Sequence, residues 1–223
     1  MRHGRHYATA ILAMGLLWVV GYGLGATSTA FAHTIIAPTW SDEANVQWKL
    51  DSTRGANLAG ATASTSYKSG DDAWNALSGS TLRFKFHSEV NLADKDLTTN
   101  PCGGTPPDAS IEIFVYGGTQ STLGVTWRCV GIIHLERAYV GLRSASTWYV
   151  GAGSPGAGQY DLRSTITHEF GHAGGLNIDF SGTSLCDNDN NPPYHTMCGT
   201  ALISNTWKRS LETHDIHSME GFY

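Results

Sequence analysis

The sequence has few charged residues and no long apolar run. Of its 223 residues, 14 are Lys or Arg and 19 are Asp or Glu. This acidic excess argues against nucleic acid or an anionic membrane as a partner, since both attract basic surfaces. The apolar run at residues 8–20 is too short for a comfortable membrane span. Internal repeats and a domain linker are also absent from the sequence, so we expect a single domain.

Residues 1–32 have the pattern of a secretory signal peptide. Arg2 and Arg5 precede the apolar run, and Ala-Phe-Ala at residues 30–32 matches a small-residue cleavage site. An uncleaved anchor is the minor alternative. Cleavage removes two basic and no acidic residues, which leaves 191 residues with 12 basic and 19 acidic side chains and a formal charge of −7. We therefore expect residues 33–223 to form a secreted, extracellular monomer that does not bind a membrane after cleavage.

Cysteine is scarce, and its even number is informative. Four cysteines in an exported chain predict two disulfides, although three pairings are possible. We favour Cys102–Cys129 and Cys186–Cys198, because each pair closes a local segment that otherwise lacks regular structure.

The apolar periodicity predicts an α+β domain. One helix is expected at residues 71–77, with a weakly patterned start within 55–69, and Asp71 and Asp72 would suit its N-terminus. A second helix should begin after the N-cap Asp161 and end at Gly174-Gly175, because paired glycines stop helices. The remaining expected elements are strands at residues 82–86, 111–116, within 131–140 and at 148–150, and an amphipathic segment at 206–222.

The second helix carries His168-Glu169-Phe170-Gly171-His172, an H-E-x-x-H motif. Residues four apart project from one helical face, so the two imidazoles can serve as neighbouring ligands of a tetrahedral Zn²⁺. Glu169 is rotated by about 100° from His168 and can reach a water at the metal without binding the metal itself. The motif therefore predicts zinc, with Glu169 as general base. Two histidines lying together on a helix by chance is the alternative.

The third ligand is not obvious from the motif. Ile178 occupies the position expected for a ligand and has no donor atom, whereas Asp179 follows it and supplies a carboxylate. A left-handed turn at Gly175 would return the chain toward the metal, so we favour Asp179. The competing candidates are Asp187, Asp189, His195, His214 and His217. A solvated loop explains Asp187 and Asp189 better than a calcium site does, so calcium has no support.

The motif, extended to Gly175, resembles that of the metzincin zinc endopeptidases. Tyr194-His195-Thr196-Met197-Cys198-Gly199 is similar to the methionine turn of that superfamily, and residues 211–223 resemble the last helix of its matrix-metalloproteinase branch. The resemblance implies a small, twisted, mostly parallel sheet, with Met197 beneath the zinc as a non-ligand. Some small bacterial secreted metzincins also use Asp as third ligand, which agrees with Asp179. For Met197 and the apolar residues near the C-terminus, ordinary core packing is the alternative.

These observations predict a secreted zinc endopeptidase that cleaves internal bonds of a protein or peptide substrate. Tyr194 and His195 could stabilise the oxyanion, although a structural role is equally consistent with the sequence. A strand within residues 131–140 or 148–150 would form the edge that pairs with substrate. The alternatives are a secreted binding or structural module with a non-catalytic zinc, which would not need Glu169, and a zinc amidase acting on cell-wall peptides. No recognisable cell-wall-binding repeat supports the amidase.

Overall fold

The computed structural model describes residues 39–92, 101–102, 110–117, 122–177, 195–199 and 203–223. The chain divides into two units, Met1–Ala30 and Phe31–Tyr223, and all described residues belong to the second. Within the described ranges, no helix is long and apolar enough to cross a membrane.

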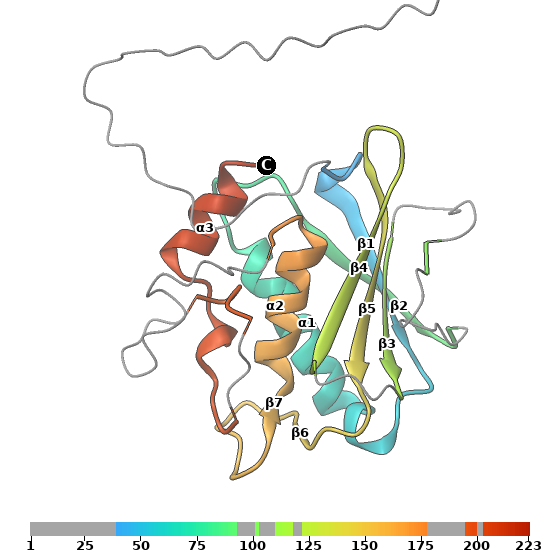
Figure 1. The fold of residues 1–223 in the computed structure, drawn as a ribbon, viewed down its shortest axis with the longest axis vertical. Helices are drawn as coiled ribbons and strands as arrows, with labels where there is room; N and C mark the ends of the chain where they lie inside the picture. Colours follow the sequence, from blue (N-terminus) through green and yellow to red (C-terminus); the bar gives the residue numbers. More distant parts are fainter. Residues whose placement is uncertain (1–38, 93–100, 103–109, 118–121, 178–194, 200–202) are drawn as a thin grey trace, which may run out of the picture. The chain divides into compact units, whose positions relative to one another are not determined.

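A mixed, mostly parallel sheet of five strands forms one layer of the domain (Figure 1). Its strands are β1 (Val46–Asp51), β2 (Phe84–Val90), β3 (Ser110–Tyr116), β4 (Gly124–Val130) and β5 (Leu135–Arg143). They lie in the order β2-β1-β3-β5-β4, and only the edge strand β4 runs antiparallel to its neighbour. The α+β class and the mostly parallel sheet expected from the sequence are therefore confirmed.

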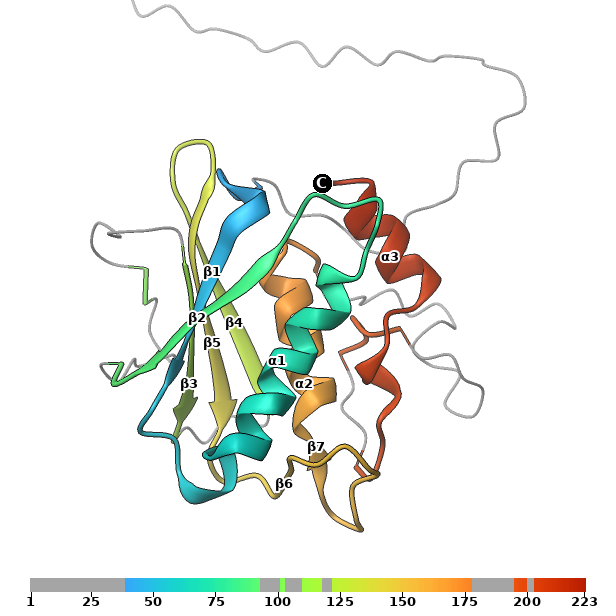
Figure 2. The same ribbon diagram turned by 180° about the vertical axis from the view of Figure 1, so that it is seen from behind.

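Two helices, α1 (Ala61–Asn75) and α2 (Leu162–Ala173), pack together against one face of this sheet (Figures 1 and 2). Gly70 permits their close crossing, because a Cβ there would lie 2.3 Å from Ile166 Cγ2. The Trp74 indole also donates to the Thr167 carbonyl oxygen at 2.8 Å. The shorter α3 (Thr213–Glu220) follows near the C-terminus. The remaining elements are β6 (Trp148–Tyr149), β7 (Tyr160–Asp161) and the 3-10 turns η1 (Glu43–Asn45), η2 (Ala56–Leu58) and η3 (Trp207–Arg209).

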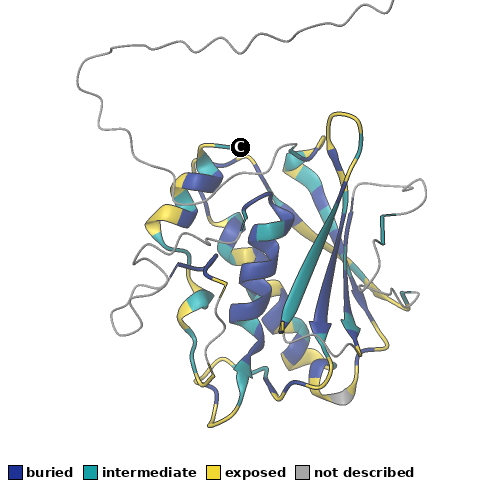
Figure 3. Ribbon diagram, viewed as in Figure 1, coloured by how far each residue is buried: buried dark blue, intermediate teal, exposed yellow. Residues whose placement is uncertain are grey.

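The main core lies between the two helices and the sheet, where burial is most continuous (Figure 3). Phe170 of α2 packs against Trp48 and Phe84, with ring centroids 5.6 Å and 4.9 Å away. A smaller cluster on the opposite face of the sheet contains Phe114, Tyr116, Cys129 and Tyr139. Strand alternation accounts for the division, since successive side chains point to opposite faces.

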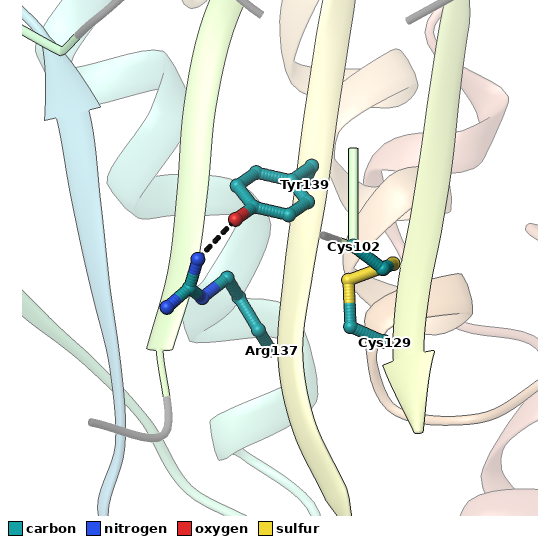
Figure 4. Close-up of a disulfide and its surroundings, with 4 residues drawn as sticks. All are labelled: Cys102, Cys129, Arg137 and Tyr139. Atoms are coloured by element: carbon teal, nitrogen blue, oxygen red, sulfur yellow. Dashed lines mark hydrogen bonds between the residues drawn. A yellow bond between two sulfur atoms is a disulfide. The ribbon is translucent and has the colours of Figure 1, made fainter. Parts of the chain in front are cut away.

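The predicted disulfide Cys102–Cys129 is present and joins Cys102 to Cys129 of strand β4, within this second cluster (Figure 4). Cys198 is disulfide-bonded as well, while its predicted partner Cys186 lies outside the described residues. A bonded cysteine pair agrees with an exported protein, because cytosolic thiols are kept reduced.

Two expectations about local structure were wrong. Helix α1 begins at Ala61, so Asp71 lies near its C-terminal end and does not serve its N-terminus. The strand expected within residues 131–140 is β5, which lies inside the sheet, whereas the two edges are β2 and β4, and β4 was not among the expected strands. The first error arose where the pattern was weak, because α1 starts among small residues. The second did not, because Val125, Trp127 and Cys129 alternate with polar residues in β4, a strand pattern that the expected elements omitted.

Candidate functional site

Helix α2 is fixed at both ends, as its sequence predicts. At the start, the Asp161 carboxylate accepts from Ser164 N at 2.8 Å, and the Arg209 guanidinium binds the same carboxylate through two nitrogens at 2.8 and 2.5 Å. At the end, the carbonyls of Ala173 and Gly174 accept from Trp40 and Tyr223 at 2.9 and 3.0 Å. The helix that carries the H-E-x-x-H motif is therefore a rigid support.

The imidazoles of His168 and His172 converge on one point. Their Nε2 atoms lie 3.1 Å apart, and each Nδ1 faces a backbone carbonyl: Thr196 O at 2.6 Å for His168 and Leu176 O at 2.8 Å for His172. A carbonyl oxygen only accepts, so each Nδ1 carries the proton of the neutral ring. Both Nε2 atoms then present lone pairs toward the same region. Adjacent nitrogens around tetrahedral zinc lie about 3.3 Å apart, so this pair fits a metal ion.

Thr196, whose carbonyl faces His168, is held through its own N–H by a residue of α3. Thr196 N donates to Asp215 Oδ2 at 2.8 Å, and the same oxygen accepts from Glu212 N at 3.1 Å. Asp215 is fully buried at the start of α3. Sequence reasoning missed Asp215, since it lies 19 residues from Thr196 and its capping-box position in α3 is the only local signal for it.

The turn after α2 has the predicted conformation up to residue 177. Gly175 has a φ of +107°, which favours glycine, and Leu176 N donates back to Gly171 O at 3.0 Å. The turn places Leu176 O where it orients His172. Asp179 lies outside the described residues, as do Asp187 and Asp189. Within the ranges that the structure describes, no group of three or more His, Cys, Asp or Glu could hold a metal ion.

Glu169 points toward strand β4. Its carboxylate is buried and accepts from Thr126 Oγ1 at 2.5 Å, while a Cβ on Gly124 would lie only 2.4 Å from its Oε1. Burial raises the pKa of Glu169 to about 7, against the opposing effects of the Thr126 hydrogen bond and the Lys208 charge. The side chain thus has a raised proton affinity and a defined orientation.

Met197 lies against α2, the helix that carries the H-E-x-x-H motif. It is fully buried, and a Cβ on Gly171 would lie 2.3 Å from its sulfur and 2.8 Å from Trp74. Gly171 of the motif must therefore remain small, because Met197 and Trp74 fill the space beside it. Core packing accounts for this contact, and a role of Met197 toward a metal stays a prediction.

The other predicted residues divide between described and undescribed positions. Tyr194 lies outside the described residues. His195 is buried and its ring packs on His214 of α3, with centroids 4.9 Å apart. Sequence reasoning missed Lys208 of η3, whose ammonium donates to the Cys198 carbonyl. Burial lowers the pKa of Lys208 to about 8, although the charges of Glu169 and Asp215 oppose the shift. Lys208 thus brings a positive charge into the surroundings of Glu169.

No protein-family model matches the sequence, and no curated protein matches it. Among solved structures, 70 chains match, including a chain of the GM1-bound form of the ECX AB5 holotoxin. That chain is 14% identical with a TM-score of 0.44, and the alignment covers 86% of this chain and 88% of that chain. At this identity and TM-score, the likeness assigns no activity, ligand or partner. The monomer expected from the sequence therefore stays a prediction.

These findings correct two expectations from the sequence. The metzincin assignment was wrong: the solved structures that match include a chain of an AB5 holotoxin. The secreted zinc endopeptidase inferred from that assignment is corrected with it, because the described residues contain no complete metal-ligand group. The physical reason is that H-E-x-x-H fixes three side chains on one helix. That arrangement specifies neither a family nor the bond that is cleaved.

Proposed function

We propose that the chain is a metal-dependent hydrolase whose metal ion is bound by His168 and His172 and whose general base is Glu169. The observation that carries this proposal is the convergence of the two Nε2 atoms at 3.1 Å while both Nδ1 atoms face carbonyl oxygens. Zinc is the proposed metal because imidazole nitrogens suit it.

The proposed mechanism divides the work among the residues of α2 and its neighbours. When bound by His168 and His172, a zinc ion would supply a water of lowered pKa. The carbonyls of Thr196 and Leu176 keep both imidazoles in the tautomer that can ligate. Glu169 accepts the proton of the attacking water and delivers it to the leaving group. Asp179, two residues beyond Asn177, remains the proposed third ligand.

The site is proposed to act after export from the cell. The signal-peptide pattern of residues 1–32 and the disulfide Cys102–Cys129 support this location. A secreted protein whose zinc has no catalytic role is the rival outcome, and Glu169 separates the two.

The test measures hydrolysis by the mature protein after loading with zinc. Activated esters, amides and phosphoesters of p-nitrophenol serve as probes, with and without a chelator. We expect turnover that requires metal, and a loss of about 10²- to 10⁴-fold in kcat for Glu169→Gln with zinc content unchanged. Zinc-loaded, folded protein with no rate above buffer on any probe would overturn the proposal and favour the non-catalytic zinc.

A further inference from the structure

Strand β4 contacts the Glu169 side chain at two positions on the same face of the strand. Thr126 and Gly124 are two residues apart, so they face the same side of the sheet. Thr126 Oγ1 lies 2.5 Å from Glu169 Oε2, and its distance to the Glu169 carbonyl oxygen is 3.4 Å. Because a hydroxyl has a single proton and a carboxylate only accepts, the short contact is a donation from Thr126 to Oε2.

Thr126 donates a hydrogen bond to the Glu169 carboxylate, and Gly124 leaves the space that this carboxylate occupies. An ideal Cβ on Gly124 would lie 2.4 Å from Glu169 Oε1, 2.8 Å from Cδ and 3.0 Å from Cγ. Any larger residue would therefore displace the carboxylate from its present position. Together, the two residues define where the Glu169 carboxylate lies and how its plane is rotated.

We propose that Thr126 is a positioning residue for the general base. Its hydroxyl occupies Oε2, so Oε1 is the oxygen that takes the proton of the attacking water, and Gly124 leaves room for that orientation. This inference rests on the proposed function, because the orientation of Glu169 affects a rate only if Glu169 acts on a water. A fixed carboxylate raises kcat, since a freely rotating base spends less time in the productive geometry.

The contact itself is tested in metal-free protein, without any activity. A double-mutant cycle compares the urea midpoints of wild type, Thr126→Val, Glu169→Leu and the double variant, because Leu has a similar volume and no acceptor for the Thr126 hydroxyl. Val preserves the shape and strand propensity of Thr, so folding is retained. We expect the two substitutions to be non-additive. Additive midpoints would show that the hydroxyl does not act on the carboxylate, and would overturn the proposal.

The consequence for catalysis is tested in zinc-loaded protein. We expect Thr126→Val to lower kcat roughly 10- to 100-fold with KM little changed, and Thr126→Ser, which keeps the hydroxyl, to remain within about threefold of wild type. Thr147→Val is the matched control, because Thr147 is an exposed threonine outside strand β4. Equal kcat for the Val and Ser variants of Thr126, in an active wild type, would overturn the positioning role alone. An inactive wild type would instead overturn the proposed function.

Discussion

Two buried carboxyl groups on neighbouring helices, Asp71 of α1 and Glu169 of α2, have similar immediate surroundings. Their exposed fractions are 4% and 3%, and each accepts one short hydrogen bond, from Trp48 Nε1 at 2.6 Å and from Thr126 Oγ1 at 2.5 Å. Burial is the largest cause that raises the pKa of each to about 7. Solvent exposure and pKa alone therefore do not distinguish Asp71 from Glu169.

Their wider surroundings differ. Asp71 faces the aromatic core, where Trp48 packs on Phe86 and Phe170, and its Oδ1 has no hydrogen-bond partner among the described residues. Glu169 follows His168 directly, and the charge of Lys208 acts on it. A raised pKa therefore marks a candidate site only where other reactive side chains converge with it. The charges of Asp72 and Lys68 act on Asp71 as well, so what distinguishes Glu169 is its place beside His168 in the H-E-x-x-H motif.

The largest expected effect separates the two carboxyl groups by activity. Glu169→Gln should lower kcat about 10²- to 10⁴-fold, whereas Asp71→Asn should leave kcat within about threefold of wild type. Steady-state hydrolysis of the probe that gives the highest wild-type rate is the measurement. If Asp71→Asn lost as much activity as Glu169→Gln, the claim that only Glu169 acts in the reaction would be wrong.

Substitution of two glycines, one beside Glu169 and one in the helix core, should have effects of intermediate size. Gly124→Ala places a methyl group against Glu169 Oε1, while Gly70→Ala places one against Ile166 Cγ2 at 2.3 Å between the helices. We expect Gly124→Ala to lower kcat roughly 10-fold with little loss of stability. Gly70→Ala should instead destabilise the fold by about 1–2 kcal/mol, since helix propensity offsets part of the overpacking. Urea denaturation and steady-state kinetics are measured for both variants. A loss of stability in Gly124→Ala with unchanged kcat, or a loss of kcat in Gly70→Ala with unchanged stability, would contradict the placing of Gly124 at the site and Gly70 in the core.

The smallest effect concerns the pH dependence of stability. Because burial raises the folded-state pKa of Asp71 to about 7, above its ordinary value of 3.8, its contribution to stability is fully present below the unfolded-state pKa. It is then lost as the pH rises through about 7. Asp71→Asn should remove this part of the decline. Urea midpoints between pH 4.5 and 8 measure the slope, with the exposed neighbour Asp72→Asn as control. Parallel slopes for wild type and Asp71→Asn would show that Asp71 does not titrate as described.

The parts of the site that the sequence predicted are those that depend on local signals. The N-cap Asp161 and the paired glycines define both ends of α2, and the four-residue spacing places His168 and His172 on one face. The supports of these side chains come from distant parts of the chain: Thr126 is 43 residues from Glu169, and Asp215 is 19 from Thr196. Tertiary packing alone brings such partners together, so no window of sequence contains them.

The errors in the fold and in the family assignment have different causes. Strands β1 and β4 were not predicted, although both alternate apolar and polar residues, as Val46, Trp48 and Leu50 do in β1. The family assignment rested on the motif and the methionine turn, which are local features around one helix. In the structure, Met197 packs directly against Gly171 of the motif, and core packing alone accounts for this contact. These two local features contain no information about which family surrounds them.

Metal binding tests the central claim most directly. Zn²⁺ titrated calorimetrically into the metal-free mature protein should bind at one ion per chain. His168→Ala and His172→Ala should each abolish that binding, while the exposed His214→Ala should preserve it, with circular dichroism showing that all variants are folded. Absence of binding to the wild type, or binding unaffected by loss of either His168 or His172, would contradict the account.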